Sequence, residues 1–345
     1  MTFQQQLIAW YRKHKRDLPW RNTTDAYLIW LSEIILQQTR VEQGMPYFVR
    51  FAETYPTVKA FAAASEDEIL KLWQGLGYYS RGRNMLKTAK KVTADFKGVF
   101  PTAYADLITL TGVGEYTAAA ISSFSSNEAR AVVDGNVYRV LARYFGVATP
   151  INSTEGKKNF QALADEILAI SNAGEHNQAM IEFGALQCKP RNPNCQVCPF
   201  VKSCFAYKHQ KINDLPVKIK KLKIRERHFN FFVIVNEKNQ LIVKRRDNSD
   251  IWAGLYDLPA IEFSGEEQPV SDFTNWFKTP PVIKKTSPQI KHVLTHQRLF
   301  ARFLEIDTKK NNLLMQDGWF WADLDDIKNY GMPKLIFEFL KKIIN

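Results

Sequence analysis

The spacing of apolar residues divides the chain into two parts. Amphipathic helices are predicted at Phe3 to Lys15, Ala26 to about Thr39, Gly156 to Ile170 and Asn177 to Leu186. From about Ile212 the pattern becomes alternating and rich in β-formers. Strands are expected at Phe229 to Val235, Gln240 to Arg246 and Arg298 to Ile306, with a closing helix at Pro333 to Ile344. The pattern predicts a multidomain protein with an all-α N-terminal region and a separate α+β domain.

Composition and charge indicate a globular protein with an anionic partner. The 345 residues, 45% of them hydrophobic, leave room for two or three domains with real cores. The excess of 47 Lys and Arg over 35 Asp and Glu gives a net charge of +12, as expected of a protein that touches polyphosphate. Charge alone leaves DNA, RNA and an anionic membrane open. No apolar run is long enough for a membrane span or a signal peptide core, so a cytoplasmic protein is expected.

A glycine-rich turn is the first candidate binding element. Gly112 and Gly114 separate the apolar pattern of Tyr104 to Leu110 from a helix-forming run after Glu115, as in a tight hairpin between two helices. Backbone N–H groups that converge at the start of a helix can hold a phosphate without any side chain. The alternative is a plain helix connection. Asp134 favours the binding element, because one helix and one turn bring its carboxylate back toward a bound backbone.

Glu33 is the only acidic residue in the helix predicted at residues 26–39. Its neighbours in sequence include Trp30, Ile34 and Ile35. We expect partial desolvation, which raises the pKa of a carboxyl group and lets it remain protonated near neutral pH as a general acid. The alternative is a glutamate on a solvated stripe of an otherwise buried helix.

Two stretches together resemble a known family. Residues 110–118, Leu-Thr-Gly-Val-Gly-Glu-Tyr-Thr-Ala, and residues 133–140, Val-Asp-Gly-Asn-Val-Tyr-Arg-Val, resemble the helix-hairpin-helix DNA glycosylases, and most closely the adenine DNA glycosylases. Thr111 stands where the family usually has proline, so we expect a less rigid turn and no lost function. The resemblance implies a monofunctional base-excision-repair enzyme. Its expected partner is double-stranded DNA in which adenine is mispaired with 8-oxoguanine or guanine, and it would act as a monomer associated with the nucleoid.

The same resemblance assigns roles to individual residues. Glu33 would protonate the flipped adenine at N7, and Asp134 would stabilise the oxocarbenium-like sugar left behind. Beside Asp134, Asn136 would position the carboxylate and Tyr116 would pack and donate a hydrogen bond. Arg21 and Glu182 would orient the purine. Residues carried over as DNA contacts, which wedge into the duplex or face the base opposite the target, are Leu36, Gln38, Thr39 and Tyr78. The phosphate contact at Gly112 and Gly114 comes from the hairpin itself. Without the resemblance, Tyr78 could equally pack on a core edge.

All four cysteines form one compact group. Cys188, Cys195, Cys198 and Cys204 fall within seventeen residues, among prolines that force a looped path. This spacing predicts a single site with four thiolate ligands, and zinc and iron-sulfur are both open from the residues alone. The resemblance implies one [4Fe-4S] cluster that shapes a basic DNA-binding loop, here with Lys189, Arg191 and Lys202.

The C-terminal part resembles a domain of the same family. Residues 252–259, Trp-Ala-Gly-Leu-Tyr-Asp-Leu-Pro, are similar to the Nudix-like domain of adenine DNA glycosylases. The paired glutamates that hold magnesium in a catalytic Nudix box do not follow, so we expect no pyrophosphatase activity. The family's Phe-Ser-His loop, which inspects 8-oxoguanine, corresponds to Leu294, Thr295 and His296. Because the aromatic residue is missing, we expect lesion discrimination to be weaker.

These assignments predict a domain organisation. We expect a helical iron-sulfur lobe at residues 1–26 and 136–211, a six-helix hairpin lobe at 27–135, a basic interdomain linker at 212–227 and a Nudix-like 8-oxoguanine recognition domain at 228–345. The linker would lie along or near DNA, or would simply be solvated.

Three other functions compete with adenine excision. A bifunctional glycosylase and lyase of the endonuclease III type needs a nucleophilic lysine at the position that Tyr116 occupies. A non-catalytic DNA-binding protein would leave the pair of Glu33 and Asp134 without a role. A nucleotide hydrolase built on the C-terminal domain would need the missing Nudix box.

Overall fold

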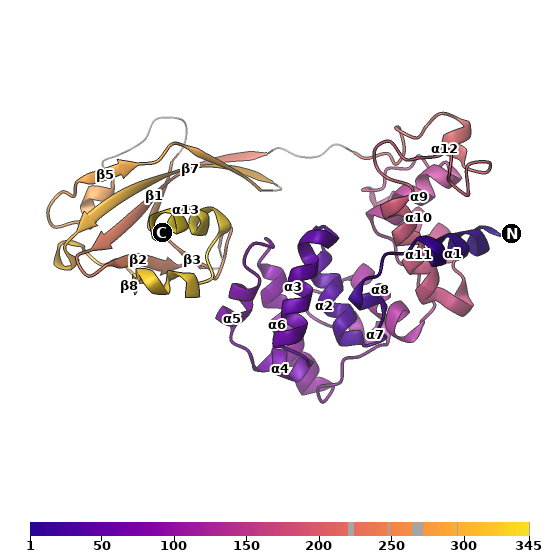
Figure 1. Cartoon of the computed structure of the whole chain (residues 1–345), viewed down its shortest axis with the longest axis horizontal. Coiled ribbons are helices and arrows are strands. Elements are labelled where there is room, and N and C mark those ends of the chain that lie inside the picture. The colour runs from indigo at the N-terminus through magenta and orange to yellow at the C-terminus, as the bar shows by residue number, and fades with distance from the viewer. Residues whose placement is uncertain (220–223, 248, 264–271, 295, 345) are drawn as a thin grey trace. The chain divides into compact units, whose positions relative to one another are not determined.

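The computed structural model describes the chain except residues 220–223, 248, 264–271, 295 and 345 (Figure 1). It forms two compact units. The first comprises Met1–Ala64 and Asn84–Lys220, and the second comprises Ser65–Arg83 and Lys221–Asn345. The first unit is helical and the second combines helices with a sheet, so the predicted fold class is confirmed.

The helices of the first unit follow the amphipathic pattern of the sequence. They are α1 (Phe3–His14), α2 (Ala26–Leu36), α3 (Val41–Thr54), α4 (Val58–Ala63), most of α6 (Ser80–Asp95), α7 (Tyr104–Leu107), α8 (Glu115–Ser126), α9 (Gly135–Phe145), α10 (Thr154–Glu166), α11 (Ala173–Leu186) and α12 (Phe205–Lys208), with short 3-10 turns at Pro19–Arg21 and Ile170–Asn172.

Helix α2 is buried in the first unit because it is apolar on almost every side. Trp30, Leu31 and Ile35 are at most 1% exposed, and the helix packs against both α3 and α8. It ends at Leu36, three residues earlier than predicted. Gln37 leaves the helical conformation and Gln38 takes a positive φ of 57°, which a continuing helix does not allow.

Helices α1, α9 and α11 share one apolar core although they are far apart in sequence. Leu7 and Tyr11 of α1 meet Leu141 of α9 and Phe183 of α11 in the same cluster. The packing of α1 on α11 brings the polar segment that follows α1 to the side of α11. This arrangement places arginines from the start of the chain beside Glu182.

The predicted hairpin joins α7 and α8. Gly112 adopts a φ of 76°, which favours glycine, and Gly114 caps the start of α8. The hydroxyl of Thr88 donates to the carbonyl of Thr111 over 2.7 Å, so the turn is attached to α6. Both glycines are exposed, which leaves the start of α8 open to a ligand.

The second unit contains an eight-stranded sheet. Its strands are β1 (Arg225–Asn236), β2 (Gln240–Arg245), β3 (Tyr256–Asp257), β4 (Ala260–Phe263), β5 (Ile283–Thr286), β6 (Ile290–Val293), β7 (Gln297–Thr308) and β8 (Trp319–Asp323). The main path runs β3-β2-β1-β7-β5, with β4, β6 and β8 paired to β1, β7 and β2. Only the long central pair β1 and β7 is parallel; the other described pairs are antiparallel.

Alternating side chains give the sheet two apolar faces. Phe231 and Phe303 pack under α13 (Lys334–Ile344), which lies over the sheet in Figure 1. On the opposite face, Phe232 and Leu304 pack with Phe273 of a short 3-10 helix. The predicted strands and closing helix are therefore confirmed, with ends that differ by a few residues.

The apolar pattern alone does not predict where two segments, residues 212–227 and residues 65–83, lie in the fold. In the basic segment at 212–227, Leu215 is buried in the core of the first unit and the N–H of Ile151 donates to the carbonyl of Val217 over 3.0 Å. At its other end, Arg225 pairs with Gln297 in the sheet. The segment Ser65–Arg83, which contains α5 (Glu66–Leu72), belongs to the second unit.

Candidate active site

A cavity of about 890 Å³ opens in the first unit between α2, α8, α9 and α11. Its walls combine apolar side chains with a small set of polar ones, the usual composition of a ligand site. The polar groups on its wall include Arg16, Arg21, Glu33, Tyr116, Asp134, Asn136 and Gln178.

Glu33 stands on the cavity wall as the single carboxyl group of α2. Burial raises its pKa to about 7, with a further increase from the nearby charge of Asp134. A hydrogen bond from Tyr116 and the charge of Arg21 act in the opposite direction and are outweighed. The expected desolvation is therefore confirmed, and the group can both give and take a proton near neutral pH.

Asp134 occupies the N-cap of α9, where its carboxylate is held by three hydrogen bonds. It accepts from the backbone N–H groups of Asn136 and Val137, both at 2.8 Å, and from the side-chain amide of Asn136 at 2.7 Å. Burial still raises its pKa above the ordinary value, while these hydrogen bonds oppose the shift. The cap fixes the direction of the carboxylate toward the cavity that Glu33 also lines.

Tyr116 is hydrogen-bonded to Glu33 and lies near the charge of Asp134. It is the second residue of α8, and its hydroxyl donates to Glu33. Burial and the charges of Glu33 and Asp134 hold the pKa of this phenol well above its usual range. Tyr116 therefore remains a neutral hydrogen-bond donor.

Glu182 lies behind the cavity wall. Its side chain is fully buried, and its carboxylate accepts from Arg21 at 2.7 Å and from the side chain of Arg16 at 2.7 and 2.9 Å. Burial opposes the charge, but the hydrogen bonds from both arginines lower the pKa of Glu182 to about 2. Arg21 and Arg16 reach the cavity and Glu182 does not, so Glu182 can act on a ligand only by positioning them.

Gln178 is a cavity residue that sequence reasoning missed. It lies one helical turn before Glu182 on α11 and accepts a hydrogen bond from the hydroxyl of Tyr11 over 2.7 Å. The spacing of four residues is the signal that could have identified it, because residues four apart share one face of a helix.

Two buried arginines connect α9 to the cysteine loop. Arg139 donates to the side-chain oxygen of Asn136 at 2.8 Å and to the carbonyl of Cys188 at 2.7 Å. Arg143 donates to the carbonyls of Lys189 at 2.7 Å and Pro190 at 3.1 Å. Asn136, which orients Asp134, thus accepts a hydrogen bond from Arg139, which also holds the cysteine loop.

The four cysteines line one small cavity in the first unit, together with Arg143. None forms a disulfide. Among the described residues, no group of three or more His, Cys, Asp or Glu side chains is arranged to hold a metal ion. Four thiols around one cavity supply the ligand set of one bound group that takes four thiolates, which can be zinc or an iron-sulfur cluster.

The side chains expected to contact DNA, apart from the two hairpin glycines, line two different cavities. Leu36, Gln38 and Thr39 lie at the wall of the cavity that contains Glu33. Tyr78 and His296 instead line a cavity in the second unit, where Tyr78 is 43% exposed. Thr295 lies outside the described residues.

The family models and the most similar sequences that we compared indicate the same family. Residues 31–166 match the HhH-GPD superfamily of base excision DNA repair proteins, and residues 230–342 match the NUDIX domain. The chain is 34% identical to an adenine DNA glycosylase of Buchnera aphidicola (strain Bp), over 99% of this chain and 97% of the relative. It is 40% identical to the human adenine DNA glycosylase over 59% of this chain and 39% of the relative.

The solved structures agree with these sequence matches. A thermostable thymine-DNA glycosylase superposes with a TM-score of 0.56 at 29% identity, covering 60% of this chain and 95% of that structure. Endonuclease III in a non-covalent complex with DNA superposes with a TM-score of 0.52 at 21% identity, covering 61% and 99%, which supports the fold alone. No helix among the described residues is long and apolar enough to cross a membrane. The chain belongs to the adenine DNA glycosylases, N-glycosyl hydrolases of base excision repair.

Proposed function

We propose that this chain removes adenine opposite 8-oxoguanine, or opposite guanine, by hydrolysis alone. The observation that carries the proposal is the pair of carboxyl groups on one cavity wall, Glu33 with a pKa of about 7 and Asp134 fixed at a helix N-cap. The substrate is a double-stranded DNA from which the adenine nucleotide is flipped into the cavity.

The reaction begins with proton transfer from Glu33 to N7 of adenine. The bond between N9 and the sugar then breaks, its electron pair remains with the base, and adenine leaves as a neutral molecule. The carboxylate of Asp134 stabilises the positive charge on the sugar, and Asn136 keeps that carboxylate in place. Water attacks the sugar and gives its proton to Glu33, which restores the acid.

Arg21 and Gln178 orient the purine from the other side of the cavity. Both reach its surface, and Arg21 is held by the buried carboxylate of Glu182. Glu182 is thus a positioning residue in this proposal.

Hydrolysis without lyase activity is supported by the residues around the cavity. A lyase needs an amine that attacks the sugar to form a Schiff base. Tyr116 stands at the position where such a lysine would follow the hairpin, and the described residues that line the cavity include no lysine.

The four cysteines line one cavity and supply the four thiolates that a [4Fe-4S] cluster takes, and their spacing in sequence resembles the cluster loop of this family. Cys188, Cys195, Cys198 and Cys204 would hold it, and the group would serve structurally behind α9. The reaction steps above depend on side chains of the first unit alone.

The direct test is single-turnover strand cleavage of a duplex with adenine opposite 8-oxoguanine. We expect cleavage at adenine only after alkali, and no adduct trapped by borohydride. Cleavage without alkali would favour the bifunctional lyase. In the Glu33→Gln variant we expect no excision while duplex binding persists; unchanged excision would refute the assignment of Glu33 as the acid.

A further inference from the structure

The second unit contains its own cavity, of about 470 Å³. One wall is the turn at residues 75–80, which includes Tyr78. The other wall is made by the loop Asp250 to Ala253, by β6 with His292, and by Lys334 at the start of α13. The cavity is polar as well as apolar, and its volume is sufficient for a purine.

Trp252 stands in this cavity on a strained backbone. Its φ is 62°, a conformation that a bulky side chain rarely adopts. Backbone hydrogen bonds close the loop around it, from Leu255 N–H to the carbonyl of Trp252 at 3.1 Å and from Gly254 N–H to the carbonyl of Arg246 at 3.0 Å. Strained residues that their surroundings hold in place concentrate at ligand sites.

A buried network of charges holds the loop of Trp252. Arg246 is paired with the fully buried Asp257 and, at 3.1 Å, with Asp250. Arg227, also buried, is paired with Asp250 at 2.7 Å. The loop is therefore anchored to β1 and to the end of β2, and the indole is presented from a fixed support.

His292 stands edge-on to Trp252, with ring centroids 6.1 Å apart. Among the described residues, neither of its ring nitrogens has a hydrogen-bond partner. Burial, with a contribution from the nearby charge of Lys334, lowers the pKa of His292, so the ring is neutral at neutral pH. A neutral imidazole offers one acceptor and one donor nitrogen.

These groups match the chemistry that separates 8-oxoguanine from guanine. Oxidation converts the acceptor at N7 into an N–H donor and adds a carbonyl oxygen at C8. A neutral imidazole can accept from that N–H, and the ammonium group of Lys334 can donate to the new carbonyl. Guanine offers neither partner in the same position.

We propose that Trp252 and His292 recognise the purine opposite adenine in this chain: the indole stacks on the base, and the imidazole accepts the N7 hydrogen that only 8-oxoguanine carries. Leu294 supplies no ring at the loop position where the family has phenylalanine, and Trp252 provides the aromatic face from another loop. The inference rests on the proposed function, since it names the residues that set its preference for the lesion.

The test uses the full-length chain with single substitutions at the two positions. Single-turnover excision and equilibrium binding are measured on duplexes with adenine opposite 8-oxoguanine or guanine. We expect Trp252→Ala to weaken binding to both duplexes by about tenfold, the effect of losing one stacked base, and Trp252→Phe to restore most of it. We expect His292→Phe to weaken excision and binding on the 8-oxoguanine duplex several-fold more than on the guanine duplex, so that the preference for 8-oxoguanine falls.

His228→Phe is the matched control, because His228 stacks on Phe300 on the opposite face of the same sheet. The inference is overturned if His292→Phe keeps the same preference as wild type and His228→Phe, or if it lowers both substrates equally. If the wild-type chain releases no adenine from either duplex, the proposed function fails instead, and the binding measurements still decide whether His292 sets a preference.

Discussion

Two carboxyl groups that face the same cavity have different surroundings and can therefore take different roles. Glu33 projects from an apolar helix and receives one hydrogen bond from Tyr116, so burial dominates and its proton is retained near neutral pH. Asp134 is capped by three hydrogen bonds at the start of α9. The ionised form is better supported at Asp134, which suits an acid at one position and an anion at the other.

The pH dependence of excision follows from these two environments. Above pH 7 we expect the single-turnover rate constant to fall about tenfold per pH unit, because the fraction of protonated Glu33 falls through a pKa of about 7. At low pH the rate should fall again as Asp134, whose pKa is also raised, takes up a proton. A rate that is flat from pH 6 to 9 would contradict the assignment of Glu33.

Replacing Asp134 by asparagine separates its charge from its structural role. Asparagine keeps the two backbone hydrogen bonds of the cap, but its amide nitrogen cannot accept from the side chain of Asn136, so we expect a loss of stability of about 1 kcal/mol. Excision should fall by roughly two to three orders of magnitude, since a charge aimed at the transition state is lost. The matched control is Asp25→Asn, which alters the N-cap of α2 in the same way and should leave excision unchanged. Equal losses in both variants would show that the effect is structural.

Because His176 is buried, we expect the chain to lose stability in mild acid. It is 2% exposed on α11, and burial lowers its pKa to about 4. Because the unfolded chain binds the proton more tightly, stability is fully present above pH 6.5 and is lost as the pH falls toward 4, by up to about 3 kcal/mol. Thermal melting from pH 7 to 4 measures this loss. The His176→Leu variant should lose less stability over the same range, and an identical pH dependence in both proteins would refute the assignment.

At the scale of elements, the two hairpin glycines meet different constraints. A Cβ atom added to Gly112 would lie 2.9 Å from the Cβ of Asn84, and its φ of 76° disfavours any side chain. A Cβ at Gly114 would meet nothing within 4 Å, and its φ of −91° is ordinary. Folding therefore favours glycine at position 112, whereas the folded chain leaves room for a side chain at position 114.

We expect alanine at position 112 to affect the stability of the chain and alanine at position 114 to affect DNA binding. We expect Gly112→Ala to destabilise the chain by about 1–2 kcal/mol, the cost of a left-handed residue with a side chain. Gly114→Ala should melt at nearly the wild-type temperature but bind duplex DNA more weakly, because the new methyl group stands where a phosphate would approach the exposed N–H groups. Wild-type binding by Gly114→Ala would place the phosphate elsewhere.

The parts of the site that are local in sequence could be predicted. The hairpin depends on two glycines, and Asp134 with Asn136 forms a helix cap within three residues. The desolvation of Glu33 follows from its apolar neighbours on α2. These features need only the backbone geometry of a few successive residues.

Other parts depend on contacts between distant segments and could not be predicted. Glu182 is buried because Arg16 and Arg21, more than 160 residues earlier, fold over its carboxylate. The early end of α2 depends on the conformation of Gln38, which the amphipathic pattern does not contain. The basic neighbours of Leu215 predict a linker, although the side chain of Leu215 fills the core of the first unit.

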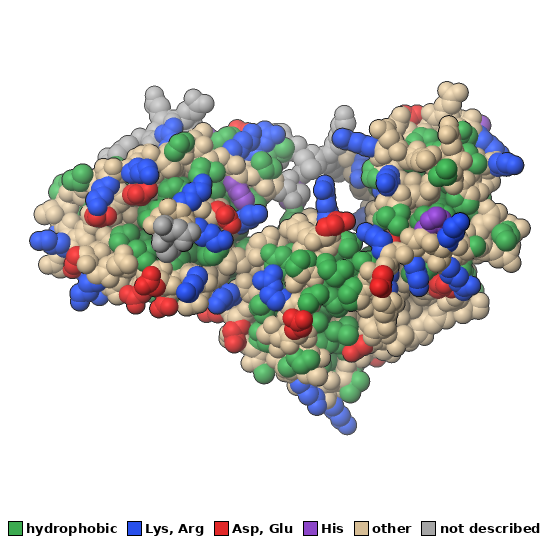
Figure 2. All heavy atoms as spheres, in the orientation of Figure 1, with side chains coloured by type: hydrophobic (Ala, Val, Ile, Leu, Met, Phe, Trp, Pro, Cys, Tyr) green, Lys and Arg blue, Asp and Glu red, His purple; other side chains and the backbone are tan. Residues whose placement is uncertain are grey.

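At the scale of the whole molecule, the positive charge is distributed over both units. Figure 2 shows Lys and Arg side chains at many points of the visible face, with fewer acidic ones between them. A net charge of +12 attracts any polyanion, so only cations near the bound strand should contribute to specific affinity.

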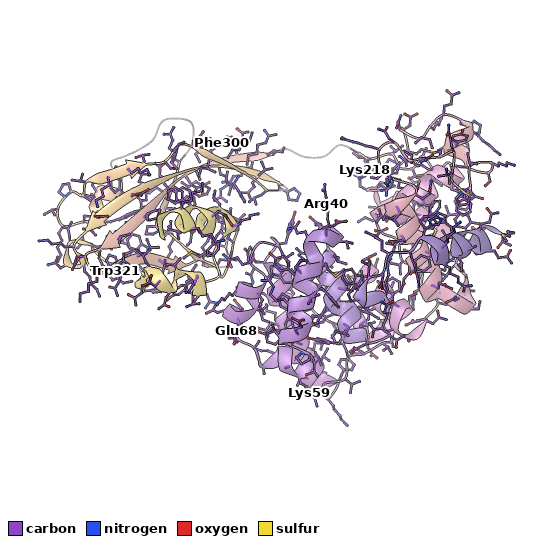
Figure 3. All side chains as sticks on the ribbon, viewed as in Figure 1. Arg40, Lys59, Glu68, Lys218, Phe300 and Trp321 are labelled. Atoms are coloured by element: carbon purple, nitrogen blue, oxygen red, sulfur yellow. The ribbon has the colours of Figure 1, made fainter. Side chains whose placement is uncertain are left out.

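The salt dependence of DNA binding can identify such cations one at a time. Arg40 is the N-cap of α3 and lines the cavity of Glu33, whereas Lys59 is on α4; Figure 3 shows the exposed Arg40 at the top and the exposed Lys59 at the bottom of the central group of helices. If Arg40 contacts a phosphate, Arg40→Gln should reduce the slope of log affinity against log salt by about one, because one counterion fewer is released.

Lys59→Gln is the control for this measurement and removes the same charge from the chain. Its slope should equal that of the wild type, although its net charge equals that of Arg40→Gln. Equal slopes for both variants and the wild type would mean that Arg40 does not contact the backbone. A reduced slope in both would mean that overall charge, rather than contact at the cavity, controls the affinity of this chain for DNA.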